Sequence, residues 1–262
     1  MAEREKRGGA GRGRGREGGR KEEGGRERER EREKEGGAGE KETASEERLA
    51  VCVVGAERWL ASMEKADRGA RAYERVLEVL EDNLAAAEAL SPIYEEANDA
   101  RKLAPVYEVR LRHDMDPEQR VALLRETGLL YEERLRQPDV AFEKYLEAFG
   151  VMPTQEVVRE DVERLAEATG GWDKVVEAFG AAIERAEIED DEVELRMSLG
   201  GVLTKVEKTE EAVAQYKAVY DLRSDHLGAI AKLSELYQQT ESWAPLLQVI
   251  DRRMELESDP ET

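Results

Sequence analysis

The chain has 262 residues, of which 39% are charged and 5% aromatic, and its formal net charge is −20 at pH 7. One cysteine cannot form an internal disulfide, and one cysteine with two histidines excludes the common Cys/His type of zinc site. The longest apolar run, Leu49 to Val54, is much shorter than the roughly 20 residues that span a membrane. The charged, glycine-rich N-terminus does not resemble a secretory signal. We therefore expect a soluble, cytoplasmic protein with no cofactor, no metal and no membrane partner.

Residues 1–48 differ in composition from the rest of the chain. They hold basic and acidic residues in nearly equal number, whereas almost all of the negative net charge lies in residues 49–262. No Val, Ile, Leu, Phe, Trp or Tyr occurs before Leu49, so no core can offset the entropy of ordering this segment. We predict a disordered, low-complexity Gly/Arg/Glu-rich tail over residues 1–45 and a folded domain over residues 46–262.

One stretch of this tail offers an alternative function. GRGRGREGGR resembles the Arg-Gly tracts of RNA-binding tails, and its positive charge can bind phosphate by counterion release. The stretch contains no aromatic residue on which a base could stack. RNA or anion binding through the tail, with the folded domain as a carrier, is therefore the alternative hypothesis.

From Leu49 onward the apolar residues follow a helical period throughout, as in Leu84, Ala87, Leu90 and Tyr94. About twelve helices fit this pattern. Asp116-Pro117 predicts a helix start, with an N-cap acceptor before a proline, and Thr154, Asp190 and Thr209 are further N-cap candidates. The sequence therefore predicts an all-α domain.

A long internal repeat indicates how the helices are organised. Residues 60–118 align with residues 203–261 without a gap and with many identical positions, such as Tyr73 with Tyr216. We call this correspondence the long repeat. Half of its period is also visible, because Tyr145 lies almost midway between Tyr73 and Tyr216. A fixed period of this kind is the signature of a solenoid of stacked helical units.

Shorter spacings within this period resemble the tetratricopeptide repeat (TPR) family. Leu199-Gly200-x-x-Leu203 is followed by Ala212-x-x-x-Tyr216, and Leu233-Ser234-x-x-Tyr237 then follows at the repeat spacing of the family. A second copy, with one extra residue in its turn, consists of Leu124, Gly128, Tyr131, Ala141, Tyr145, Ala148 and Pro153. The resemblance covers about Glu46 to Thr262. The repeat-defining positions are Leu90, Tyr94, Gly128, Tyr131, Ala141, Tyr145, Trp172, Leu199, Gly200, Ala212, Tyr216, Leu233, Tyr237 and Trp243.

This resemblance implies a right-handed superhelical solenoid of about six antiparallel helix pairs. Small residues such as Gly128 and Gly200 would let paired helices approach closely, while the tyrosines fill the space between successive pairs. Two departures keep a related helical-hairpin solenoid open. The link from Leu165 to Trp172 is shorter than the link from Leu233 to Trp243, and Leu103 and Leu246 replace the usual small residue of the second helix.

No catalytic constellation occurs in the sequence, which lacks a P-loop, a GxSxG and a His-Glu-x-x-His motif. We interpret His113 and His226 as turn residues and Cys52 as a small buried side chain. The acidic run Glu187 to Glu194 lacks the spacing of a calcium loop and is interpreted as a charged helix start. These observations favour a non-catalytic protein.

The TPR resemblance implies a concave groove, lined by the first helix of each pair, that binds a partner peptide or protein. By matched position, the groove presents Glu88, Glu95, Arg125, Glu126, Glu132, Glu163, Arg164, Lys205, Lys232, Glu235 and Gln238. The acidic excess favours a basic or amphipathic partner and disfavours nucleic acid on this domain. Both asparagines, Asn83 and Asn98, lie outside these positions, so the Lys/Asn clamp for C-terminal carboxylates is missing. Alternatively, the charge only keeps an extended surface soluble.

The C-terminal helix is expected to have an uncovered apolar side. A helix near Ser242 to Glu257 would expose Leu246, Ile250 and Met254, and solenoids normally need a polar capping helix there. Asp259-Pro260-Glu261 repeats the helix start at Asp116-Pro117-Glu118. We expect that this chain is a fragment of a longer array, or that a partner covers the helix, with self-association as one possibility.

Overall fold

The computed structural model describes residues 66–258 of a chain that divides into two units, residues 1–80 and 81–262. The predicted tail over residues 1–45, Cys52 and the repeated Asp259-Pro260-Glu261 lie outside the described residues. In the first unit, the described element is helix α2 (Ala66–Val79), whose Tyr73 and Val76 are buried. Residues 66–258 contain helices and turns but no strand, which confirms the all-α class.

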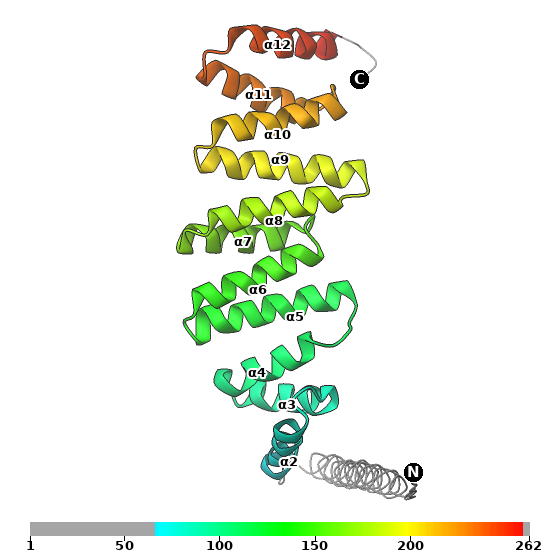
Figure 1. Ribbon diagram of the computed structural model, residues 1–262, viewed down its shortest axis with the longest axis vertical. Coiled ribbons are helices and arrows are strands. Elements are labelled where there is room, and N and C mark those ends of the chain that lie inside the picture. Colours follow the sequence, from blue (N-terminus) through cyan, green and yellow to red (C-terminus); the bar gives the residue numbers. More distant parts are fainter. Residues whose placement is uncertain (1–65, 259–262) are drawn as a thin grey trace, which may run out of the picture. The chain divides into compact units, whose positions relative to one another are not determined.

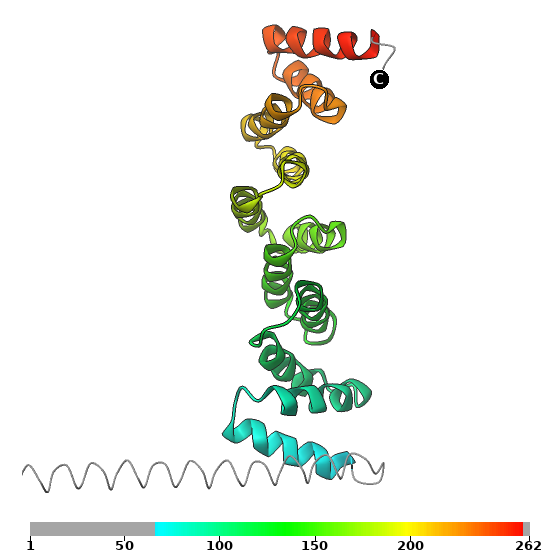
Figure 2. The same ribbon diagram turned by 90° about the vertical axis from the view of Figure 1, so that its right-hand side faces the viewer.

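The described part of the second unit consists of five consecutive helix pairs (Figure 1). The first helices are α3 (Leu84–Glu96), α5 (Pro117–Leu129), α7 (Glu156–Thr169), α9 (Glu189–Lys205) and α11 (Leu227–Gln239). The second helices are α4 (Ala100–Leu111), α6 (Pro138–Val151), α8 (Trp172–Arg185), α10 (Thr209–Leu222) and α12 (Trp243–Ser258). Each helix packs against the next along the chain, and Figure 2 shows them as two staggered rows. This arrangement confirms the predicted helical-hairpin solenoid.

The backbone of the turns distinguishes the links within pairs from the links between pairs. Each of the five within-pair turns has one residue in the left-handed region, with φ between 54° and 75°: Asn98, Arg136, Gly170, Glu207 and Glu241. No other residue between 66 and 258 has a positive φ. A left-handed residue after a helix reverses the chain direction and ends the helix. The second helix of each pair therefore always follows such a residue.

The long repeat of the sequence is also a repeat of the structure. Helices α2, α3 and α4 begin at Ala66, Leu84 and Ala100, and the positions aligned with them, Thr209, Leu227 and Trp243, begin α10, α11 and α12. The left-handed residues Asn98 and Glu241 are aligned in the same way. Helix boundaries and turn conformation therefore recur together with the side-chain identities.

Glycine allows the first and second helices of a pair to approach closely. A Cβ atom at Gly128 would lie 2.8 Å from Cζ of Tyr145, and one at Gly200 would lie 2.6 Å from Cζ of Tyr216. Both tyrosines are only 2% exposed. Because carbon atoms at this distance overlap, a larger residue at either glycine would displace the aromatic ring.

The extra residue of the α5–α6 pair lies inside the first helix and not in the turn where the sequence suggested it. Gly128 and Ala141 are separated by one residue more than the equivalent Gly200 and Ala212. The structure accommodates this residue as a π-helical turn, η2 (Leu130–Arg134), which continues α5. One-turn π segments of this kind absorb single insertions in helices and occur frequently at functional sites.

Helix starts agree only partly with the predicted N-caps. The Asp116 side chain accepts a hydrogen bond from the Glu118 backbone N–H (3.1 Å), as predicted, and α5 begins at Pro117. The other three predictions are wrong, because Thr154 precedes the capping position of α7 and Asp190 and Thr209 lie within the first turns of α9 and α10. His226 caps α11 instead, with Nδ1 accepting from the Ala229 N–H (3.0 Å).

Candidate protein-binding surface

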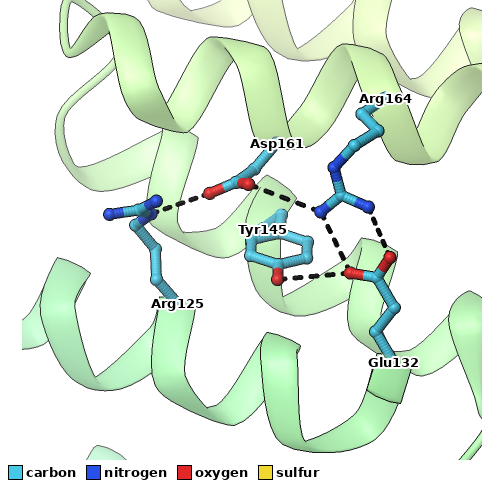
Figure 3. Close-up of polar contacts among 5 residues, drawn as sticks. All are labelled: Arg125, Glu132, Tyr145, Asp161 and Arg164. Atoms are coloured by element: carbon cyan, nitrogen blue, oxygen red, sulfur yellow. Dashed lines mark hydrogen bonds and ion pairs between the residues drawn. The ribbon is translucent and has the colours of Figure 1, made fainter.

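Several charged residues expected to line a groove instead bind one another between successive pairs (Figure 3). Arg125 on α5 donates from Nε to Oδ2 of Asp161 on α7 at 2.8 Å. Arg164 on α7 binds both carboxylate oxygens of Glu132 on η2, and it also contacts Asp161 at 3.4 Å. The Tyr145 hydroxyl of α6 donates to Glu132 Oε2 at 3.4 Å. These five residues form one polar network that connects α5, η2, α6 and α7.

Burial and neighbouring charges raise the pKa of two groups in this network, Tyr145 and Arg164. Burial raises the pKa of Tyr145 to about 12, and the nearby carboxylates of Asp161 and Glu132 add to the shift. The hydrogen bond to Glu132 raises the pKa of Arg164 above its usual value. The Arg164 guanidinium also lies 5.9 Å from the centre of the Tyr145 ring. At neutral pH Tyr145 is therefore uncharged, and the two arginines of the network balance the charge of its two carboxylates.

The same kind of pairing continues along the row of first helices. Glu163 on α7 binds Lys205 on α9, and Lys232 binds Glu235 within α11 at 2.9 Å. Most of the predicted groove residues are therefore held in ion pairs: Arg125, Glu132, Glu163, Arg164, Lys205, Lys232 and Glu235. Ion pairs at this level of exposure contribute roughly 0–1 kcal/mol each, so their effect is mainly to neutralise this part of the surface.

The row of second helices carries a matching set of ion pairs that sequence reasoning missed. Lys144 on α6 binds Glu108 on α4 at 2.9 Å, and Lys174 on α8 binds Glu143 on α6. Lys208, at the start of α10, binds Asp173 on α8 at 3.0 Å. Charged residues on both rows therefore connect one helix pair with the next.

The remaining predicted groove residues behave differently. Glu95 on α3 accepts a hydrogen bond from the Tyr107 hydroxyl at 2.7 Å, and burial and this hydrogen bond raise the pKa of Tyr107. Within residues 66–258, Glu88, Glu126 and Gln238 are exposed and make no ion pair or side-chain hydrogen bond. Among the predicted groove residues, the glutamates that make no ion pair therefore lie on α3 and α5.

A hollow of about 260 Å³ opens between α3, α4, α5 and η2. Its apolar part consists of Tyr94, Leu103, Tyr107, Leu129 and Leu130, and its acidic part of Glu95, Glu126 and Glu133. Arg134, which also lines it, donates a 2.9 Å hydrogen bond to the Asn98 carbonyl and binds the Asn98 side chain. We call this the η2 hollow, because the π-helical turn supplies Leu130, Glu133 and Arg134.

A second hollow, of about 460 Å³, opens between α3, the end of α4 and α5. Glu88 and Glu126 line it together with Arg110, His113 and Met115, so Glu126 belongs to both hollows. We define the acidic face by the four glutamates of these hollows: Glu88, Glu95, Glu126 and Glu133. Sequence reasoning identified Glu88, Glu95 and Glu126 but missed Glu133. Glu133 lies in the π-helical turn η2, which the sequence indicated only by the one extra residue of this repeat.

A third hollow, of about 540 Å³, lies farther along the first-helix row. It is lined by Glu160, Glu163, Arg164 and Glu167 of α7, by Trp172 of α8 and by Lys205 of α9. Lys205 already binds Glu163, so this hollow is less acidic than the acidic face.

The described residues give no sign of a reactive centre. No group of three His, Cys, Asp or Glu side chains within residues 66–258 is arranged to hold a metal ion. His113 Nε2 lies 2.7 Å from the Asp82 carbonyl, and His226 caps α11, so both histidines take part in turns. None of the helices in this part of the chain is long and apolar enough to cross a membrane.

Comparison with known proteins finds similarity only among solved structures. No family model and no curated protein matches the chain. A crystal structure of MamA is 14% identical, with a TM-score of 0.38, and covers 66% of this chain and 91% of its own. BtubC (BKLC) from P. vanneervenii is 15% identical, with a TM-score of 0.39, and covers 78% of this chain and 91% of its own.

YrrB, described as a TPR protein with an unusual peptide-binding site, is 19% identical, with a TM-score of 0.34 and coverages of 69% and 89%. The peptide-binding site in this description is that of YrrB. The helix pairs of this chain by themselves define its fold as a helical-hairpin solenoid.

Proposed function

We propose that this chain is a non-catalytic scaffold that binds a basic segment of another protein on its acidic face. The observation that carries the proposal is the η2 hollow. There, apolar side chains lie beside Glu95, Glu126 and Glu133, and within residues 66–258 no cation is paired with these carboxylates. Farther along the first-helix row, the carboxylates of the polar network are already paired with Arg164.

The chemistry of the hollow selects the kind of side chain that fits. Lysine and arginine combine an apolar stem with a charged head, and such a side chain can place its stem against Tyr94, Leu103 and Leu129. Its head group then reaches Glu126 or Glu133 for a charge-assisted hydrogen bond. The adjacent hollow, which shares Glu126, offers Glu88 to a second basic residue of the same segment.

Selection from a random peptide library on the immobilised full chain tests this proposal. We expect the selected peptides to be enriched in lysine or arginine next to apolar residues, and their affinity to fall with ionic strength. The variant Glu88→Lys/Glu126→Lys/Glu133→Lys should lose at least tenfold in affinity. Enrichment of neutral or acidic peptides, or equal binding by the variant, would overturn the proposal.

A charge-matched control separates the acidic face from net charge. Glu177, Glu184 and Glu210 are exposed on the second helices α8 and α10, outside the acidic face. Glu177→Lys/Glu184→Lys/Glu210→Lys changes the net charge by the same amount and should bind the selected peptides like the unmodified chain. Glu132 and Glu163 are left unchanged, because reversing them would break the ion pairs to Arg164 and Lys205.

The alternative function, RNA or anion binding through residues 1–45, stays a prediction, because those residues lie outside the described part of the chain. Nuclease treatment of any captured complex distinguishes the two functions, since only complexes held through RNA are lost.

A further inference from the structure

Helix α12 has an apolar side that no described residue covers. Trp243, Leu247, Ile250 and Met254 recur at helical spacing and are between 36% and 61% exposed. Ile250 and Met254 were expected to be exposed, whereas Leu246, expected with them, is buried together with Val249. We call the four exposed side chains the α12 apolar face.

The long repeat shows how equivalent residues are used elsewhere in the protein. Leu247, Ile250 and Met254 are aligned with Ala104, Tyr107 and Leu111 of α4, which are all buried. Helix α5 follows α4 and packs against it. In the described second unit, each of the second helices α4, α6, α8 and α10 is likewise packed against a following first helix. The α12 apolar face therefore corresponds in position to the surface of α4 that is buried, and α4 packs against a following first helix.

One segment of this chain outside the described residues has the sequence of a first helix. The long repeat aligns α2 with α10, and α10 is preceded in the chain by the first helix α9. Residues 49–60 precede α2 and therefore occupy the corresponding place in the sequence. Their apolar residues Leu49, Val53, Ala56 and Leu60 recur at helical spacing, as on one side of an amphipathic helix.

We propose that the α12 apolar face of one molecule binds residues 49–60 of a second copy, as a second helix binds a following first helix within the chain. The two surfaces in this contact differ, so it is a head-to-tail interface that leaves one free surface at each end of the assembly. It does not use the acidic face, and it therefore stands or falls independently of the proposed function.

Sedimentation velocity of the full chain over a range of concentrations tests this proposal, with two variants that each block one surface. Leu247→Glu/Ile250→Glu places charge on the α12 apolar face, where both side chains are already exposed. Val53→Glu/Leu60→Glu places charge on the proposed occupant. Ile188→Glu changes an equally exposed apolar residue at the start of α9 and serves as the matched control.

We expect the unmodified chain and the Ile188→Glu control to form species larger than a monomer, and each double variant alone to be monomeric. An equimolar mixture of the two double variants should form a complex of two chains and no more, because it contains one intact pair of surfaces. Three results would overturn the proposal: an unmodified chain that stays monomeric, a mixture that stays monomeric, or a Val53→Glu/Leu60→Glu variant that dimerises alone through α12. Circular dichroism of each variant checks that the helices are retained.

Discussion

The close approach of Gly128 to Tyr145 makes a quantitative prediction about stability. In Gly128→Ala, the new Cβ would lie 2.8 Å from Cζ of a ring that is 2% exposed, so the ring or the helix must move. Overpacking of this kind costs about 1–3 kcal/mol. Alanine also favours the helix over glycine by about 1 kcal/mol, which offsets part of this loss.

Gly180 provides the matched control, because it lies within α8 and a Cβ there would meet no atom within 4 Å. Gly180→Ala should gain the helix propensity without the overpacking. The difference between the two variants then isolates the packing cost, and we expect the free energy of unfolding of Gly128→Ala to be lower by about 1–3 kcal/mol. Urea denaturation followed by circular dichroism measures both.

A double variant adds a second check on the packing cost. Gly128→Ala combined with Tyr145→Leu should lose less stability than the sum of the two single changes, because the smaller side chain leaves room for the Cβ atom. Equal stability of Gly128→Ala and Gly180→Ala would refute the close helix contact between α5 and α6.

The turns and the polar network support three more predictions. Glu207→Gly should raise the urea midpoint by an amount corresponding to roughly 0.5 kcal/mol, because glycine relieves the left-handed conformation at φ 60° but adds entropy to the unfolded chain. Arg164→Ala should lower the free energy of unfolding by roughly 0.5–1 kcal/mol in low salt, and by less in high salt, because it removes a half-exposed ion pair with Glu132. Stability should fall as the pH rises from about 10 to 12, because folded Tyr145 keeps its proton over a range in which the unfolded tyrosine loses it; Tyr145→Phe should reduce this fall in a pH series of urea titrations.

The helices and their pairing could be predicted because they depend on spacings that the sequence displays directly. Gly128 and Tyr145 recur as Gly200 and Tyr216, and each glycine lies against its tyrosine in the structure. Since a repeated spacing imposes a repeated packing, the long repeat also predicts that the pair α11–α12 reproduces the pair α3–α4.

The candidate surface could be predicted only in part. Groove positions were assigned by helix register, which does not say which long side chains bind one another across neighbouring helices. The pair between Glu132 and Arg164 depends on the π-helical turn η2, which the sequence signalled only as one extra residue. Glu133 became part of the surface for the same reason, since η2 places it beside α3 and α4.

The central claim, that the acidic face binds another protein, is tested most directly by an affinity pull-down from nuclease-treated native lysate, read by mass spectrometry. The full chain, the Glu88→Lys/Glu126→Lys/Glu133→Lys variant and the charge-matched Glu177→Lys/Glu184→Lys/Glu210→Lys control are compared side by side. We predict a protein that the unmodified chain and the control retain and the acidic-face variant loses. Equal retention by all three chains would contradict the claim, as would a set of partners that disappears when the nucleic acid is digested.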